Sequence, residues 1–230
     1  MNTTGICKLH EFTASILAAN PLRLFDNLTI LQEIGVKSLH IDIMDGHYVN
    51  NLALSYETLN AISQAFPKFN LDIHLMVKNV EQSLNHLTSI KPRMITFHPS
   101  TCKNPAAIIH LIQQHCQASI AINPTEKVEN YLELFNKAKH CLVMGVHPGK
   151  CGQPFQKKAL ETIVTLHQFT QKTNLNAQIA IDGGVNTSSL LAIQKTGVPI
   201  TQKVVGSALF KKLHYQENWK ALHACAQNMT

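Results

Sequence analysis

The chain has 230 residues, of which 45% are hydrophobic and 15% charged, a globular composition with enough length to bury one core. Its apolar runs fall short of the roughly 20 residues that cross a bilayer, and its first ten residues lack a secretory signal, so we expect a cytoplasmic protein with no membrane partner. The net charge of +6 comes mostly from single lysines without interleaved aromatic residues, which argues against a nucleic-acid partner and suits a small anionic substrate. Six scattered cysteines without a Cys-x-x-Cys pair argue against structural zinc and a disulfide framework.

Short apolar runs alternate with longer amphipathic segments along the whole sequence. Residues 22–34 form the first helical pattern, with Leu24, Leu28 and Leu31 at helical spacing and Gly35 as a natural helix end. Residues 154–171 carry a second clear helical pattern, and Asn186 is a typical helix start. The runs that we predict as strands are residues 12–17, 38–44, 70–76, 93–98, 117–122, 139–146, 177–181 and 200–205.

This alternation determines the expected fold class. Strands that alternate strictly with helices lie parallel and are joined by right-handed crossovers, in a doubly wound sheet or a closed barrel. Eight units within about 220 residues favour the barrel. We therefore predict an α/β protein with a single (β/α)₈ TIM barrel, formed as one domain by residues 1–230. Active sites in such barrels lie at the carboxyl ends of the strands.

Chemically useful side chains are expected at those strand ends. His40 and Asp42 share one face of the second strand, Asp72 and His74 share one face of the third, and Asp182 follows the seventh. Mixed imidazole and carboxylate ligands suit one divalent ion such as Zn, Fe(II), Mn or Co. Unpaired buried charge is costly, so the convergence of four such groups favours a metal site over ordinary interior hydrogen bonding. Asp72 is left out, because it can pair with a nearby lysine instead.

Glycine-bearing loops follow the sixth, seventh and eighth strands. Phosphate groups in these barrels commonly bind to the loops after strands seven and eight, where glycines let backbone amides approach the anion. The loop at residues 147–153 could close over a bound substrate. Three methionines end strands near the proposed metal and form either ordinary core or a floor of polarizable sulfur beneath the substrate: Met44, Met76 and Met144.

In order and spacing, nine short stretches resemble the ribulose-phosphate 3-epimerase family, and the likeness spans nearly the whole chain. The resemblance implies a barrel of the ribulose-phosphate-binding type and one divalent ion held by His40, Asp42, His74 and Asp182. It further implies that Asp42 and Asp182 exchange a proton as acid and base, and we expect a homo-oligomer. The stretches are residues 15–17, 40–47, 72–76, 96–98, 123–124, 148–149, 152–153, 182–185 and 206–208. The substrate-binding residues implied are Ser15, His74, Gly149, Lys150, Cys151, Gly152, Gly183, Gly184, Gly206 and Ser207.

The implied reaction is 3-epimerisation of a ketose phosphate through a metal-stabilised enediolate, with D-ribulose 5-phosphate and D-xylulose 5-phosphate of the pentose phosphate pathway as the leading substrate pair. A hexulose 6-phosphate such as D-allulose 6-phosphate is the alternative. Lys150 and Cys151 stand where the family usually has phenylalanine and glycine, which leaves the substrate open. A lyase of the orotidine-phosphate type is disfavoured because His74 replaces the lysine of its Asp-x-Lys-x-x-Asp motif. A non-catalytic sugar-phosphate binder is disfavoured by the two retained aspartates.

Overall fold

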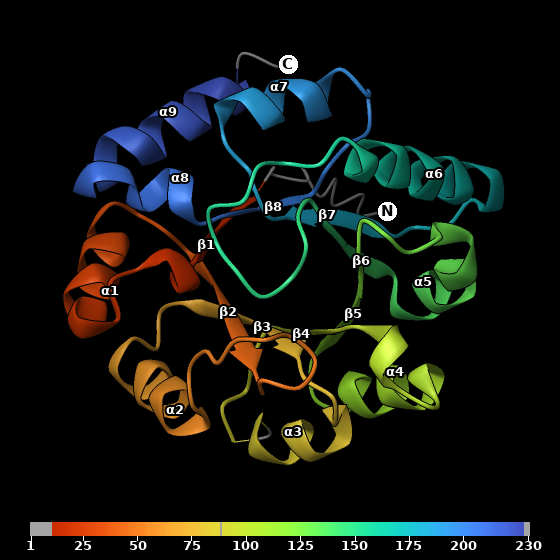
Figure 1. The fold of residues 1–230 in the computed structure, drawn as a ribbon, viewed down its shortest axis with the longest axis horizontal. Coiled ribbons are helices and arrows are strands. Elements are labelled where there is room, and N and C mark those ends of the chain that lie inside the picture. Colours follow the sequence, from red (N-terminus) through yellow and green to blue (C-terminus); the bar gives the residue numbers. More distant parts are fainter. Residues whose placement is uncertain (1–10, 88, 228–230) are drawn as a thin grey trace, which may run out of the picture.

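The computed structural model describes residues 11–87 and 89–227, in which parallel strands close into a barrel with the helices around its outside (Figure 1). Each strand pairs with its sequence neighbour, and β8 pairs with β1, so the predicted (β/α)₈ barrel is confirmed. Residues 1–10, 88 and 228–230, which the one-domain prediction also includes, lie outside the described residues. The strands are β1 (Glu11–Ser15), β2 (Ser38–Met44), β3 (Asn70–Met76), β4 (Met94–Phe97), β5 (Gln117–Ile122), β6 (His140–Met144), β7 (Gln178–Asp182) and β8 (Gln202–Val205).

The connections between strands are mostly helical. Within the described residues, no helix combines the length and the apolar character needed to span a bilayer. The α-helices are α1 (Leu24–Glu33), α2 (Tyr56–Ala65), α3 (Val80–Leu87), α4 (Pro105–Gln113), α5 (Leu132–Ala138), α6 (Lys158–Thr173), α7 (Thr187–Gln194), α8 (Ser207–Phe210) and α9 (Tyr215–Gln227). Short 3₁₀ turns are η1 (Ile16–Ala18), η2 (Pro21–Arg23), η3 (Pro99–Thr101), η4 (Val128–Tyr131) and η5 (Lys211–Leu213).

Local backbone chemistry explains where elements depart from the predicted bounds. The predicted strand 139–146 is shorter because Lys139 is the left-handed C-cap of α5, with φ 57°, and so cannot extend β6. The predicted helix 154–171 begins later, at Lys158, because the segment before it packs across the barrel end against Gly184. Asn186 does begin a helix, since its side chain accepts from the backbone amides of Ser188 and Ser189 in a capping box.

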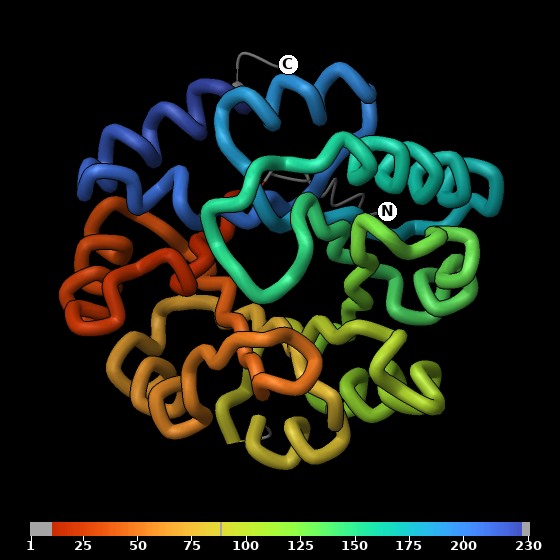
Figure 2. The backbone as a smooth tube through the Cα atoms, in the orientation of Figure 1, coloured from red at the N-terminus to blue at the C-terminus, as the bar shows by residue number. Residues whose placement is uncertain are grey.

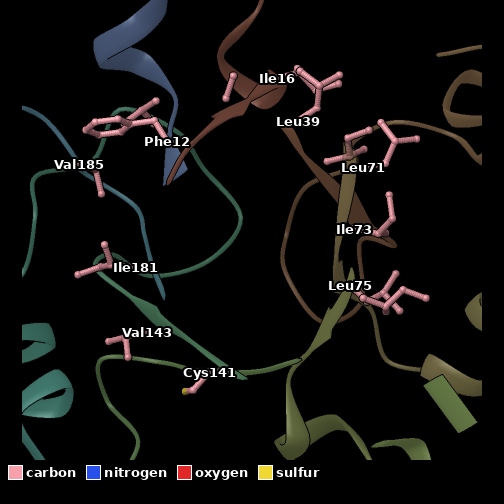
Figure 3. Packing of buried hydrophobic residues seen from close by; sticks show 14 of the residues in the cluster. Phe12, Ile16, Leu39, Leu71, Ile73, Leu75, Cys141, Val143, Ile181 and Val185 are labelled. Carbon is pink, nitrogen blue, oxygen red and sulfur yellow. The ribbon is translucent and has the colours of Figure 1, made fainter. Parts of the chain in front are cut away.

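Two apolar layers stabilise the barrel. The outer layer joins strands to helices, and Leu71, Ile73 and Leu75 of β3 point outward into it (Figure 3). The inner layer is smaller and consists of the buried residues Ala121, Leu142, Met144, Ala180 and Val204. This division follows from the strand period of two, which sends alternate side chains to opposite faces of the sheet.

A polar cluster fills the end of the barrel where the strands begin. Asp72 is buried there and pairs with Arg93, whose Nε lies 2.8 Å from Asp72 Oδ1, and Gln202 Nε2 also donates to Asp72 at 2.5 Å. The cationic partner is therefore an arginine rather than the expected lysine. Since this cluster lies two residues below His74 along β3, Asp72 is structural and stays outside the candidate site.

Candidate active site

Strand register brings the four predicted metal ligands together at the carboxyl end of the barrel. Asp42 of β2 is the register partner of His74 on β3, and Asp182 is the last residue of β7. His40, one pleat below Asp42, points into the same interior space. One nitrogen or oxygen from each of the four side chains lies within 4.8 Å of the others, and three of the four residues are buried.

The distances within this cluster are short. His74 Nδ1 lies 3.0 Å from Asp42 Oδ1 and 4.0 Å from Asp182 Oδ2. His40 Nε2 lies 3.3 Å from Asp42 Oδ1, 3.5 Å from Asp182 Oδ2 and 3.3 Å from His74 Nδ1. In a tetrahedral zinc site, with bonds of 2.0–2.1 Å, neighbouring ligand atoms are roughly 3.4 Å apart. The donor set and its spacing therefore fit one divalent ion of the borderline class.

Burial and the neighbouring charges shift the pKa values of the cluster. Burial lowers the pKa of His40, but the charges of Asp42 and Asp182 outweigh it and raise that pKa to about 9. Burial raises the pKa of Asp42, yet the histidines His40 and His74 hold it well below its usual range. For Asp182 burial dominates over the nearby His40, so its pKa is raised.

An open cavity lies above the cluster, and both aspartates line it. Met76 and Met144 also line the cavity, whereas Met44 is buried against Val49 and Met76 beside it. The predicted substrate-binding residues along its wall are Ser15, Gly149, Lys150, Cys151, Gly152, Gly183, Gly184, Gly206 and Ser207. His74 does not line it, because its side chain is fully buried behind the aspartates.

Glycine is required at the loop after β7. Gly183 and Gly184 have φ values of 97° and 68°, a region that L side chains rarely adopt. A Cβ atom at Gly184 would lie 2.8 Å from backbone atoms of Phe155, and one at Gly183 would lie 2.4 Å from the side chain of Val146. The close approach of residues 153–155 therefore depends on Gly184, and the packing of Val146 depends on Gly183. Both glycines line the cavity.

Two loops meet over the mouth of the cavity. Residues 145–157 cross the centre of the barrel in Figure 2, and the loop after β2 reaches them from the side. Asn51 Nδ2 donates to the carbonyl oxygen of Gly149 at 2.8 Å, and Gln153 Nε2 donates to the carbonyls of His147 and Lys150. Lys150 and Cys151 are exposed at this mouth. No role was predicted for Asn51, because a contact between loops 98 residues apart produces no periodic pattern in the sequence.

His98 is a second residue that the sequence left without a role. It follows β4, is completely buried, and its Nε2 lies 2.9 Å from Nε2 of His74. Its inward direction could have been found from the strand period, because it lies two residues after the inward-facing Thr96.

Comparison with known proteins agrees with this arrangement. A model of the family described as "Ribulose-phosphate 3 epimerase family" matches residues 11–210. The chain belongs to this family. It is 28% identical over 221 residues to a ribulose-phosphate 3-epimerase of Buchnera aphidicola, covering 94% of this chain and 96% of that one. It is 33% identical over 174 residues to a protein of the same name from Helicobacter pylori, covering 75% and 79%.

Solved structures show the same fold at much lower identity. A 3-keto-L-gulonate-6-phosphate decarboxylase from Vibrio cholerae superposes with a TM-score of 0.73 at 11% identity, over 96% of this chain and 98% of that one. A phosphoribosyl anthranilate isomerase from Thermus thermophilus gives a TM-score of 0.66 at 13% identity, over 96% and 100%. Likeness at this level identifies the barrel alone, so membership of the epimerase family rests on the sequence matches.

Proposed function

We propose that this member of the epimerase family interconverts D-ribulose 5-phosphate and D-xylulose 5-phosphate by moving the proton on C3. The observation that carries the proposal is the pair Asp42 and Asp182, two carboxyl groups from separate strands that line one cavity with His40 and His74 beside them. Inversion at C3 needs one group to remove a proton and a second group to return a proton on the opposite face. The two aspartates supply such a pair.

The chemistry follows from the weak acidity of a C–H bond beside a ketone. Asp42 or Asp182, whichever is ionised, takes the C3 proton, and the other carboxyl delivers a proton to the opposite face of the enediolate. In the reverse direction the two residues exchange roles. Each correctly placed acid or base contributes roughly 10²–10⁴-fold to the rate.

A metal ion has a defined place in this proposal. His40, Asp42, His74 and Asp182 would hold it, and their four donor atoms have the required spacing. When bound, a divalent ion polarises the ketone and its neighbouring hydroxyl and makes the C3 proton easier to remove. Ser15 Oγ lies 3.4 Å from Asp42 Oδ2 and can orient that carboxylate from the cavity side.

The phosphate is proposed to bind at the wall of the cavity that the loops after β7 and β8 form. Gly183, Gly184 and Gly206 expose backbone there, and Ser207 begins α8 directly after Gly206. Backbone amides in such loops bind phosphate without a bulky side chain in the way. The net charge of +6 favours the approach of the anion.

A hexulose 6-phosphate such as D-allulose 6-phosphate remains the second candidate substrate. The observation that favours it is the composition of the cavity mouth, where Lys150 and Cys151 replace the usual aromatic residue and glycine of the family. The flexible four-carbon stem of Lys150 can move aside for one more carbon, or its ammonium group can reach the phosphate of a longer sugar.

The experiment is a comparison of kcat/KM for the two ketose phosphates, using protein loaded separately with Zn, Fe(II), Mn or Co. We expect turnover of D-ribulose 5-phosphate, loss of it after chelation, and recovery when the ion is returned. A higher kcat/KM for D-allulose 6-phosphate would identify the hexulose phosphate as the substrate instead of the pentulose phosphate. Inactivity with both sugars at full metal occupancy would contradict an epimerase.

We further propose, from the sequence, that the protein is cytoplasmic and assembles as a homo-oligomer. Cell fractionation followed by immunoblotting tests the first. Size-exclusion chromatography with light scattering tests the second, where a mass equal to one chain would contradict it.

A further inference from the structure

His98 lies directly behind the cluster and has no part in the steps described above. Its Nε2 is 2.9 Å from Nε2 of His74. The other nitrogen of His74, Nδ1, faces the opposite way, 3.0 Å from Asp42 Oδ1 and 3.3 Å from His40 Nε2. His74 therefore uses one ring nitrogen toward the ligand set and the other toward His98.

Imidazole chemistry fixes the direction of the hydrogen bond between these two rings. A neutral imidazole carries one N–H, and a nitrogen that ligates a metal ion carries none. With Nδ1 in the ligand set, His74 must carry its hydrogen on Nε2 and donate it. His98 Nε2 must then accept, which places the hydrogen of His98 on Nδ1.

The surroundings of His98 suit a neutral acceptor. The ring is fully buried, with the His74 ring centroid at 5.1 Å and the Tyr48 ring centroid at 4.9 Å. Within the described part of the chain, Nδ1 of His98 is buried without a hydrogen-bond partner. The hydrogen that the neutral ring carries on Nδ1 is also buried without an acceptor, but burying a neutral N–H costs much less than burying an imidazolium cation with the same N–H unpaired.

We propose that His98 is a positioning residue for the metal site, whose Nε2 accepts a hydrogen bond from His74 and so fixes the orientation and tautomer of that ligand. Metal-binding histidines usually donate to a carboxylate, a backbone carbonyl or water. A neutral imidazole in this place holds the ring without adding a third negative charge beneath a site that already contains Asp42 and Asp182. The inference rests on the proposed metal site but does not depend on which sugar is the substrate.

Three variants separate positioning from stability. His98→Leu removes the acceptor, whereas His98→Gln keeps an oxygen near the position of Nε2. His140→Leu is the matched control, because His140 is a buried histidine of the same barrel that contacts Ser119 Oγ at 2.8 Å, at the start of β6 and away from the ligands. The zinc dissociation constant of each protein is measured by competition with a chelating dye, and thermal unfolding is recorded in parallel.

Loss of such a partner typically weakens metal binding about 10–100-fold. We expect that loss for His98→Leu, at least partial recovery for His98→Gln, and unchanged zinc affinity for His140→Leu despite its lower stability. Equal zinc affinity in wild type and His98→Leu would overturn the inference while leaving the metal site intact. Absence of zinc binding by the wild type would overturn both.

Nuclear magnetic resonance tests the same inference without a substitution. In zinc-loaded, ¹⁵N-labelled protein, long-range ¹H–¹⁵N correlations report which ring nitrogen of each histidine carries hydrogen. We expect His74 protonated on Nε2 and His98 protonated on Nδ1 alone. Hydrogen on Nε2 of His98 in the loaded protein would contradict an accepting role.

Discussion

Replacement of Gly184 by alanine should damage substrate binding and stability together. The residue has φ 68°, and its new Cβ would lie 2.8 Å from the backbone N and Cα of Phe155. The left-handed conformation costs a non-glycine residue about 1–2 kcal/mol. Overpacking against a fixed backbone adds about 1–3 kcal/mol. The free energy of unfolding should therefore fall by roughly 2–5 kcal/mol, unless residues 153–155 move away.

Movement of residues 153–155 has its own consequence. Gln153 donates to the carbonyls of His147 and Lys150, so its displacement would disturb the loop over the cavity. We expect KM for the ketose phosphate to rise at least tenfold in Gly184→Ala. The assay pairs urea unfolding with steady-state kinetics coupled to consumption of the product.

Gly197 provides the control for this substitution. It has a nearly identical φ of 70°, but a Cβ there meets nothing within 4 Å. Gly197→Ala should therefore lower the free energy of unfolding only by the cost of the left-handed conformation, about 1–2 kcal/mol, and should leave KM unchanged. Equal destabilisation of the two variants, together with an unchanged KM in Gly184→Ala, would refute the reasoning.

Three further predictions concern separate parts of the barrel. Asn51→Ala removes the hydrogen bond to Gly149, worth about 0.5–1.5 kcal/mol, and should raise KM several-fold in steady-state assays while lowering the melting temperature by only a few degrees. Burial and Arg93 lower the pKa of His140 to about 3 from 6.5, so its stabilising contribution is complete above pH 6.5 and is lost as the pH falls toward 3. Between pH 6 and 5, the free energy of unfolding of the wild type, measured with urea, should therefore fall by about 1.4 kcal/mol per pH unit more than that of His140→Asn. The same pH dependence in the two proteins would contradict this prediction. Arg93→Met leaves Asp72 buried without its cation and should lower the unfolding free energy by up to roughly 3–5 kcal/mol, whereas a loss below 1 kcal/mol in urea would refute that pairing.

Regular features of the fold followed from the sequence because they repeat. Short apolar runs between amphipathic segments predicted β2, β3 and β5 with the bounds that the structure has. The strand period of two predicted that His40 and Asp42 point inward. This period does not predict contacts between elements far apart in the chain, because such contacts depend on how the loops fold.

Two cases illustrate this limit. Met44 and Met76 look equivalent from their strand positions, yet only Met76 lines the cavity, because Val49 in the loop after β2 packs beside Met44. Similarly, the ion pair of Asp72 with Arg93 joins β3 to the residue before β4, and an arginine displaces the lysine that the sequence suggested. Burial of the Asp72 carboxylate predicts that its partner is cationic, but it does not predict which residue that partner is.

Exchange of the C3 hydrogen with solvent deuterium tests the two-aspartate proposal most directly. Each epimer is incubated separately in D₂O with metal-loaded wild type, Asp42→Asn or Asp182→Asn, and the C3 position is followed by nuclear magnetic resonance. Wild type should label both epimers. Each variant should stop epimerisation but still label one epimer, and the labelled epimer should differ between Asp42→Asn and Asp182→Asn, because each remaining carboxylate serves one face. Labelling of the same epimer by both variants, at equal metal occupancy, would contradict the assignment.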